Sequence, residues 1–322
     1  MKGLVYKQHN GFSGLMVEEI PKPSPKEDEV LVRVKASSLN IVDYEPFRRP
    51  AGRPEFFSKM VGSLQNGKVL GGECSGIIEA IGKNVFHLSV GDEVYGKTPG
   101  VIGTGAWAEY AVMKSGQVER KPATLSFEEA ASIPVAGEVA LGGVRKAHIQ
   151  PGRQVMIYWA SGGVGQYAVQ FAKAQGATVT GVCSTRNQEL AWALGCDDVI
   201  DYKKDDFRKV GQKFDSIIGV NGCNPISHYK KLLKANGTFV CIGNGKQAMH
   251  ALVLSLFSKK IKTSALPLEP IKDCLAYAQK LAEAGQLKPH IDKVYPVQEA
   301  QSAIEYVLEQ HVQGKVVLRM EF

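Results

Sequence analysis

An unbroken apolar run from Val155 to Ala160 lies near the middle of the chain, and small residues follow it at once. Such a run is typical of a strand that is buried on both faces of a parallel sheet. Beyond it the apolar positions change to helical spacing, with one face formed by Val164, Ala168, Val169, Phe171 and Ala172. The pattern predicts a strand, a tight turn and a helix.

The same alternation of short apolar runs and helical patterns continues toward the C-terminus. We expect further strands at Thr178–Val182, Val199–Ile200, Ser216–Val220 and Thr238–Ile242, and helices at Gln188–Leu194, Ile226–Leu233 and Met249–Phe257. Strands that alternate with helices favour a parallel sheet, with a ligand bound beyond the carboxyl ends of the strands. The fold class is therefore α/β, with a doubly wound parallel sheet.

The first 122 residues have a different pattern, in which apolar and polar residues alternate with period two. Strands are expected at Glu29–Ala36, Ser75–Ile81 and Trp107–Val112, which indicates a compact, barrel-like β domain. Ser126 to Glu129 has the form of a capping box, and a helix should start there. Lys315–Arg319 reads as a strand that returns to the β domain. We therefore expect one domain from 1–122 with 268–322 and a nucleotide-binding domain at 123–267.

Composition narrows the class of protein. The 322 residues are 44% hydrophobic with a net charge of +7, and the cations are spread along the chain with no basic run typical of nucleic-acid binding. The uncharged stretch Gln154–Ala172 has the length of a membrane span, but its glycines and glutamines fit a soluble strand and helix better. No long apolar signal sequence follows Met1. We expect a cytoplasmic protein that binds neither nucleic acid nor membranes.

The six cysteines show no C-x-x-C spacing, and most of them fall within apolar patterns. Small buried cysteines in a reducing compartment are the simplest interpretation. The sequence predicts neither a disulfide framework nor a structural zinc site.

The turn after the first apolar run has the spacing of a dinucleotide fingerprint. Small side chains let the backbone approach a pyrophosphate, and the amide groups at the start of the following helix can hold it. An isolated motif of this kind could be only a packed corner between strand and helix, but the repeated strand and helix pattern favours nucleotide binding. The candidate residues are Ala160, Ser161, Gly162, Gly163, Val164 and Gly165.

The residues after the second strand bear on the choice of cofactor. NAD-binding folds usually place an acidic residue there to hold the ribose, but no carboxylate precedes Glu189. Ser184 and Arg186 could instead donate hydrogen bonds to a 2′-phosphate. An exposed residue at a helix start is the alternative for Arg186. The sequence favours NADPH.

Several motifs together resemble one family. They are Ser38-Leu39-Asn40-Ile41-Val42-Asp43, Gly72-Glu73-Cys74-Ser75-Gly76, Gly91-Asp92-Glu93-Val94, Pro134-Val135-Ala136-Gly137 and Ala160 to Gly165. With these the chain resembles, over essentially its whole length, the zinc-free quinone oxidoreductase branch of the medium-chain dehydrogenase/reductase superfamily, especially the chloroplast-envelope homologues. The resemblance implies a GroES-like catalytic domain beside a Rossmann domain. It also implies reduction of α,β-unsaturated carbonyl compounds by NADPH, with Tyr202 and Asn221 as further cofactor contacts. Half-buried packing after a short strand is the alternative for Tyr202.

The departures from zinc-dependent members concern the metal ligands and the substrate pocket. Gly72 replaces the histidine of their G-H-E triplet, and Asn40 stands in place of a ligand cysteine, so the resemblance implies no catalytic zinc. The segment 48–70 also differs. By resemblance it borders the substrate pocket, whose size and closure the sequence leaves open.

Without a metal, the reaction needs an acceptor that is already electrophilic, such as a quinone, an enone or an alkenal. The candidate catalytic residues are Asn40, whose amide could hold the substrate carbonyl or the nicotinamide ribose, and Tyr44, whose phenol could donate to the developing enolate. A core position is the alternative for Tyr44, and Asp43 reads as a structural acceptor. Solvent could supply the proton, so an essential acid is not required.

Two other functions stay open, namely an enoyl-thioester reductase and a non-catalytic NADPH-binding sensor or interaction protein. We also expect a homodimer, because Ile261–Leu266 reads as a sheet edge that can pair with a second copy.

Overall fold

The structure is a computed structural model that describes residues 1–7, 14–44, 67–99, 105–221, 224–243, 245–263, 270–309 and 312–322. The chain divides into two compact units. Unit 1 contains residues 1–135, 271–283 and 291–322, and unit 2 contains residues 136–270 and 284–290. The domain limits at 122/123 and 267/268 stay predictions.

Unit 2 is built on a six-stranded parallel sheet with the order β11-β10-β9-β12-β13-β14. From β9 the chain adds strands outward in one direction and then, from β12, in the other, so the order reverses between β9 and β12. This reversal is the switch point at which doubly wound folds bind nucleotides. The expected fold class is confirmed. The strands are β9 (Gln154–Tyr158), β10 (Thr178–Cys183), β11 (Asp198–Asp201), β12 (Phe214–Val220), β13 (Leu233–Ile242) and β14 (Ile261–Thr263).

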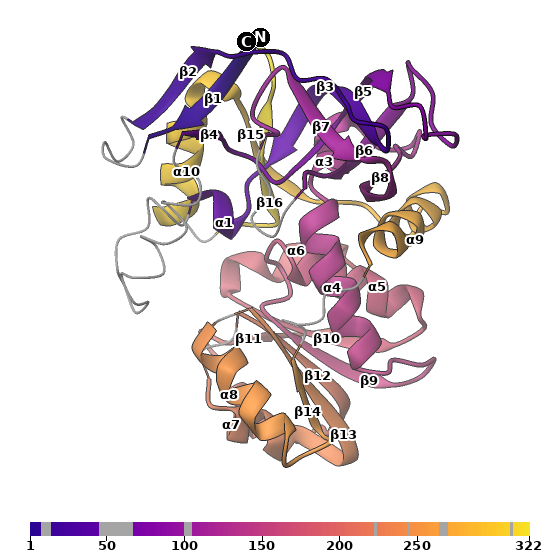
Figure 1. The fold of residues 1–322 in the computed structure, drawn as a ribbon. Helices are drawn as coiled ribbons and strands as arrows, with labels where there is room; N and C mark the ends of the chain where they lie inside the picture. The colour runs from indigo at the N-terminus through magenta and orange to yellow at the C-terminus, as the bar shows by residue number, and fades with distance from the viewer. Residues whose placement is uncertain are drawn as a thin grey trace. The chain divides into compact units, whose positions relative to one another are not determined.

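Helices pack along this sheet as the alternating pattern requires (Figure 1). They are α4 (Pro134–Lys146), α5 (Gly165–Ala174), α6 (Gln188–Ala193), α7 (Ile226–Leu232) and α8 (Gly245–Ser255). Helix α5 contacts β9 and β10, and α8 contacts β13 and β14. The uncharged stretch Gln154–Ala172 is thus β9 with most of α5. Within the described ranges, none of the helices has both the length and the apolar character to cross a bilayer. The cytoplasmic location stays a prediction.

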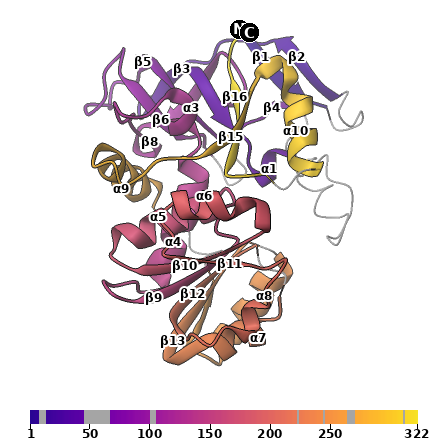
Figure 2. The ribbon, with the colours of Figure 1, turned by 180° about the vertical axis from the view of Figure 1, so that it is seen from behind.

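Unit 1 contains a seven-stranded, mostly antiparallel sheet and a smaller sheet of order β2-β1-β4 (Figure 2). The strands of the larger sheet are β3 (Glu29–Ser38), β5 (Glu73–Ile81), β6 (Glu93–Lys97), β7 (Tyr110–Lys114), β8 (Val118–Arg120), β15 (Ile291–Pro296) and β16 (Lys315–Arg319). The smaller sheet has β1 (Lys2–Tyr6), β2 (Leu15–Glu19) and β4 (Lys68–Val69). Its helices are α1 (Ile41–Tyr44), α3 (Phe127–Ala131), α9 (Ile271–Glu283) and α10 (Ala300–Glu309).

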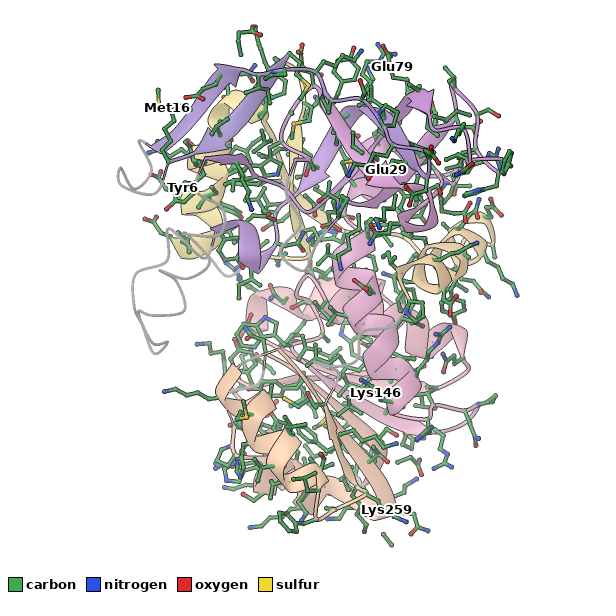
Figure 3. The ribbon with its side chains drawn as sticks, in the orientation of Figure 1. Tyr6, Met16, Glu29, Glu79, Lys146 and Lys259 are labelled. Carbon is green, nitrogen blue, oxygen red and sulfur yellow. The ribbon has the colours of Figure 1, made fainter. Side chains whose placement is uncertain are left out.

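Pairing across long sequence distances closes unit 1. Strand β16 pairs with β3 in the register Val317 to Ser38, which confirms that the last strand returns to the β domain. Tyr6 and Trp107 lie in its core, and Tyr6 is labelled in Figure 3. The capping box is confirmed, since Ser126 Oγ accepts from the Glu129 N–H at 3.1 Å and the Glu129 carboxylate accepts from the Ser126 N–H at 2.8 Å.

The strand expected at Trp107–Val112 starts later than the alternation indicates, at Tyr110. The Trp107 carbonyl accepts from Leu4 N at 2.8 Å, and Trp107 N donates to Leu70 O at 2.9 Å. Trp107 and Ala108 therefore pair next to the smaller sheet, and contact with β3 begins at Glu109, whose carbonyl accepts from Val34 N at 3.0 Å.

Candidate functional site

The turn between β9 and α5 brings backbone unusually close to backbone. A Cβ on Gly165 would lie 2.1 Å from the carbonyl oxygen of Trp159 and 2.8 Å from that of Ala160. Gly162 N donates to Trp159 O at 3.2 Å, which closes the turn. Only glycine fits at 165, and the turn has the form of a cradle that can accept a pyrophosphate.

The segment after β10 is tied to this turn by a buried hydrogen bond. Asn187 Nδ2 donates to Ser161 Oγ at 2.8 Å, so the 3₁₀ turn Thr185–Asn187 is anchored to the glycine-rich turn. Ser184 is half-buried and Arg186 is exposed. Two of the predicted cofactor segments thus lie side by side, joined by a bond between residues 26 positions apart in sequence.

Asp201, at the end of β11, holds the same segment from the other side. Its carboxylate accepts from Thr185 Oγ1 at 2.6 Å, from Gln188 Nε2 at 2.9 Å and from Lys203 N at 2.9 Å. Although desolvation works in the opposite direction, the hydrogen bond from Thr185 and the others keep the pKa of Asp201 below its usual value. The sequence carries no local signal for this residue, because its partners become neighbours only when β10 and β11 pair.

Tyr202 and Asn221 complete the set of predicted cofactor residues. The Tyr202 ring is half-buried and stacks on Trp159, with ring centroids 6.2 Å apart and an angle of 17° between the planes. Asn221 is exposed just beyond β12, with φ of 47° and its N–H donating to Ile242 O at 2.8 Å. All the predicted cofactor residues therefore follow the carboxyl ends of four adjacent strands, β11, β10, β9 and β12. Their contact with a cofactor stays a prediction.

Unit 1 contains a buried group of polar side chains, which we call the amide–carboxylate cluster: Asn40, Asp43, Glu73 and Lys315. Asn40 Nδ2 donates to Glu73 Oε1 at 2.7 Å, and Lys315 Nζ donates to Asn40 Oδ1 at 2.8 Å and to Glu73 Oε1 at 3.1 Å. All four residues are at most 9% exposed. Charges buried this deeply are stable only when they are paired and hydrogen-bonded, as they are here.

Glu73 is the centre of the cluster. Besides Asn40 and Lys315, its carboxylate accepts from Ser38 Oγ and, at 2.6 Å, from the backbone N–H of Val135 in the first turn of α4. Four donors, one of them an N–H in the first turn of a helix, all stabilise the carboxylate in its charged form. Glu73 is therefore a charged acceptor for its neighbours.

Asp43 lies at the edge of the cluster and is less well satisfied. Its Oδ2 accepts from Asn40 N at 2.8 Å, while its fully buried Oδ1 has no hydrogen-bond partner among the described residues. Burial, together with the charge of Glu73, raises the pKa of Asp43 to about 7, although the bond from Asn40 N opposes the shift. The Asp43 carboxyl therefore keeps its proton to a higher pH than an ordinary aspartate.

The two predicted catalytic residues have different surroundings. Asn40 belongs to the cluster, whereas Tyr44, at the end of α1, is half-buried against the hydrophobic core of unit 1. Glu73 and Lys315 are site residues that were not predicted from the sequence. Glu73 stood within a motif that signalled its position, but a single lysine at the start of an apolar strand carries no local signal. Residues 48–66, most of the segment 48–70 that was predicted to border the substrate pocket, lie outside the described residues.

The cluster does not fit a zinc ion. Position 72 is a glycine with no donor atom, and the amide oxygen of Asn40 already accepts from the Lys315 ammonium. A second cation among these atoms would be repelled by that ammonium. In the ranges that the structure describes, no group of three or more His, Cys, Asp or Glu residues is placed to hold a metal.

Comparisons with known proteins agree with this architecture. Residues 26–123 match the family described as "Alcohol dehydrogenase GroES-like domain", and residues 194–318 match "Zinc-binding dehydrogenase". The chain is 31% identical to the "Chloroplast envelope quinone oxidoreductase homolog" of Arabidopsis thaliana, over 99% of this chain and 98% of the relative. It is 30% identical to the "NADPH-dependent alkenal/one oxidoreductase, chloroplastic" of the same plant, over 99% of this chain and 79% of the relative.

A solved structure of a quinone oxidoreductase from Coxiella burnetii is similar over 100% of this chain and 99% of its own, with a TM-score of 0.87 and 28% identity. Sequence and fold thus lead to the same group of proteins.

Proposed function

The chain belongs to the quinone oxidoreductase branch of the medium-chain dehydrogenase/reductase superfamily, and we propose that it reduces quinones or α,β-unsaturated carbonyl compounds with NADPH and without zinc. It is an oxidoreductase that uses a nicotinamide cofactor. The main support for reduction without zinc is the Asn40 amide, which is held by two charged neighbours in a cluster that does not fit a metal.

The residues of the chain have separate tasks in this reaction. The turn Ala160–Gly165 holds the pyrophosphate through backbone N–H groups. When bound, the nicotinamide supplies a hydride. Asn40 donates its second amide N–H to the carbonyl oxygen of the acceptor, on which negative charge develops. Tyr44 is the second candidate donor, and solvent protonates the enolate.

The central experiment follows nicotinamide absorbance in purified, metal-free protein. We expect rapid NADPH oxidation with a linear alkenal, a cyclic enone or a quinone, slow oxidation of NADH, and no gain on adding zinc. Preference for an enoyl thioester would move the substrate assignment to the enoyl reductases. Tight binding of NADPH with no acceptor consumed would contradict the proposal and favour a non-catalytic NADPH-binding protein.

Arg186 should set the preference for NADPH. Its guanidinium is exposed directly after β10, on a turn that Asn187 and Asp201 hold in place. A charge-assisted hydrogen bond contributes about 1.5–3 kcal/mol, so Arg186→Ala should raise KM for NADPH by about 10- to 100-fold and leave KM for NADH unchanged. Steady-state kinetics with both cofactors measures this. Arg208→Ala, which removes an exposed arginine paired with Asp206, is the control. An equal rise in KM for both cofactors would contradict the assignment of Arg186 to the 2′-phosphate.

The proposed homodimer has a candidate surface in unit 2. Exposed apolar side chains recur with helical spacing along α8 and just after it: Met249, Leu252, Val253, Leu256 and Phe257. In the part of the chain that the structure describes, β14 beside α8 pairs only with β13. Its expected continuation, 264–266, lies outside the described residues. An apolar stripe next to an open strand edge is typical of an interface between copies. Lys259, labelled in Figure 3, follows the stripe.

Charged residues on this stripe should separate the copies. The double variant Leu256→Glu/Phe257→Glu places two carboxylates where the side chains are 78% and 84% exposed, so the fold of unit 2 should survive. We expect sedimentation at micromolar concentration to change from dimer to monomer. Phe86→Glu, at an equally exposed phenylalanine of unit 1, should leave the dimer intact. A wild-type protein that sediments as a monomer would contradict the homodimer.

A further inference from the structure

Lys315 is a buried lysine whose hydrogen bonds are all used inside the protein. Its ammonium donates to Leu39 O at 3.0 Å, to Asn40 Oδ1 at 2.8 Å and to Glu73 Oε1 at 3.1 Å. An ammonium group has three N–H donors and no acceptor. Lys315 therefore has no donor left for a substrate, and its effect on chemistry must act through its neighbours.

The neighbour that it controls is the amide of Asn40. Lys315 offers only donors and the ionised Glu73 offers only acceptors, so the amide oxygen must face Lys315 and the amide nitrogen must face Glu73. A flipped amide would lose both hydrogen bonds, because its N–H donors would face the Lys315 ammonium and its oxygen would face the Glu73 carboxylate. The orientation of Asn40 is thus fixed by two charges, and among the described residues the second N–H of Nδ2 has no acceptor, which leaves it for a ligand.

The same ammonium also polarises the amide. A positive charge at Oδ1 favours the resonance form with positive charge on nitrogen, and this makes the remaining N–H a stronger donor. The low dielectric around residues that are at most 9% exposed strengthens the effect.

We propose that Lys315, together with Glu73, is a positioning residue that orients and polarises the Asn40 amide, so that its free N–H stabilises the negative charge developing on the acceptor's carbonyl oxygen. This inference rests on the proposed function. The positive charge that polarises the amide in this cluster is then the Lys315 ammonium, a side chain of the protein. The step itself is the addition of hydride to the β-carbon or quinone ring, with the electron pair moving to that oxygen and a proton then taken from water.

Two substitutions separate orientation from polarisation. Lys315→Gln keeps an N–H donor for Asn40 Oδ1 but removes the charge, whereas Lys315→Met removes both. We expect kcat with an alkenal to fall in the order wild type, Lys315→Gln, Lys315→Met, with a loss of about 10- to 100-fold for the last, since a lost oxyanion donor lowers kcat by about 100- to 1,000-fold. The loss should be smaller with a quinone, whose reduction depends less on an added donor. The dissociation constant for NADPH should stay within about twofold.

Lys121→Met is the matched control. Lys121 is another lysine of unit 1 with a well-covered side chain, 6% exposed, that donates to Leu125 O at 2.7 Å and lies 3.1 Å from Glu93. Its removal should lower thermal stability as Lys315→Met does, but it should leave kcat of the folded protein unchanged.

A double-variant cycle decides whether Lys315 acts through Asn40. In an Asn40→Ala background, Lys315→Met should cause no further loss of kcat, because the amide that it positions is already gone. The inference would be overturned if the kcat losses of the two single variants multiply in the double variant. It would also be overturned if Lys315→Met lowers kcat equally with alkenal and quinone. If Lys315→Met does not fold, Lys315→Gln in the same cycle gives the answer. Wild-type protein that oxidises no NADPH with any acceptor would instead overturn the proposed function.

Discussion

Gly165→Ala should abolish nicotinamide cofactor binding at ordinary concentrations. The added Cβ would lie 2.1 Å from Trp159 O and 2.8 Å from Ala160 O. Both are backbone atoms at the end of a buried strand, so relief requires β9 and α5 to move apart. Overpacking of this kind typically reduces stability by about 1–3 kcal/mol, and a shift of the turn also displaces the N–H groups that hold the pyrophosphate.

We expect the affinity for NADPH to fall at least 100-fold, roughly 2.7 kcal/mol, with a clear loss of thermal stability. Quenching of tryptophan fluorescence by the cofactor measures the first and a thermal melt the second. Gly211→Ala is the matched control in unit 2, because no heavy atom lies within 4 Å of its added Cβ. Binding of NADPH by Gly165→Ala with wild-type affinity would show that the turn tolerates a side chain. It would contradict the proposal that this turn holds the pyrophosphate.

Asp43→Asn should remove a large pH dependence of stability. Burial raises the pKa of Asp43 to about 7 from 3.8, so the folded protein retains a proton that the unfolded chain releases. In this range the unfolded state binds fewer protons, and the free energy of unfolding falls as the pH rises from about 4 to about 7. Below and above these values the contribution is constant. A shift of about three pH units corresponds to roughly 4 kcal/mol.

Asparagine stays neutral over this range and can still accept the hydrogen bond from Asn40 N. We therefore expect the free energy of unfolding of the variant, minus that of the wild type, to rise by about 4 kcal/mol between pH 4 and pH 8. Urea unfolding, followed by a probe in unit 1, gives both values. Other carboxyls with shifted pKa values, such as Asp197 and Asp206, are present in both proteins and cancel. If the free energies of unfolding of the two proteins change with pH in parallel, the raised pKa of the buried Asp43 is contradicted.

The sequence alone was sufficient to predict the nucleotide-binding half of the protein. Its strands are short apolar runs and its helices follow local spacing, so the pattern predicted β9 to β13 in chain order, and the parallel fold followed from their alternation. The glycine-rich turn was also visible, because a close approach of backbone to backbone demands small residues at neighbouring positions. Likewise, the capping box at Ser126 depends on atoms only three residues apart.

Only the tertiary structure showed the amide–carboxylate cluster and the support of the turn after β10. Lys315 reaches Asn40 across 275 positions and Glu73 across 242, because β16 pairs with β3 and β3 with β5. Asp201 reaches Thr185 because β10 and β11 pair. A local pattern records which face of a strand is apolar, but not which distant strand will lie beside it. The tertiary structure alone therefore determined which charged groups surround Asn40.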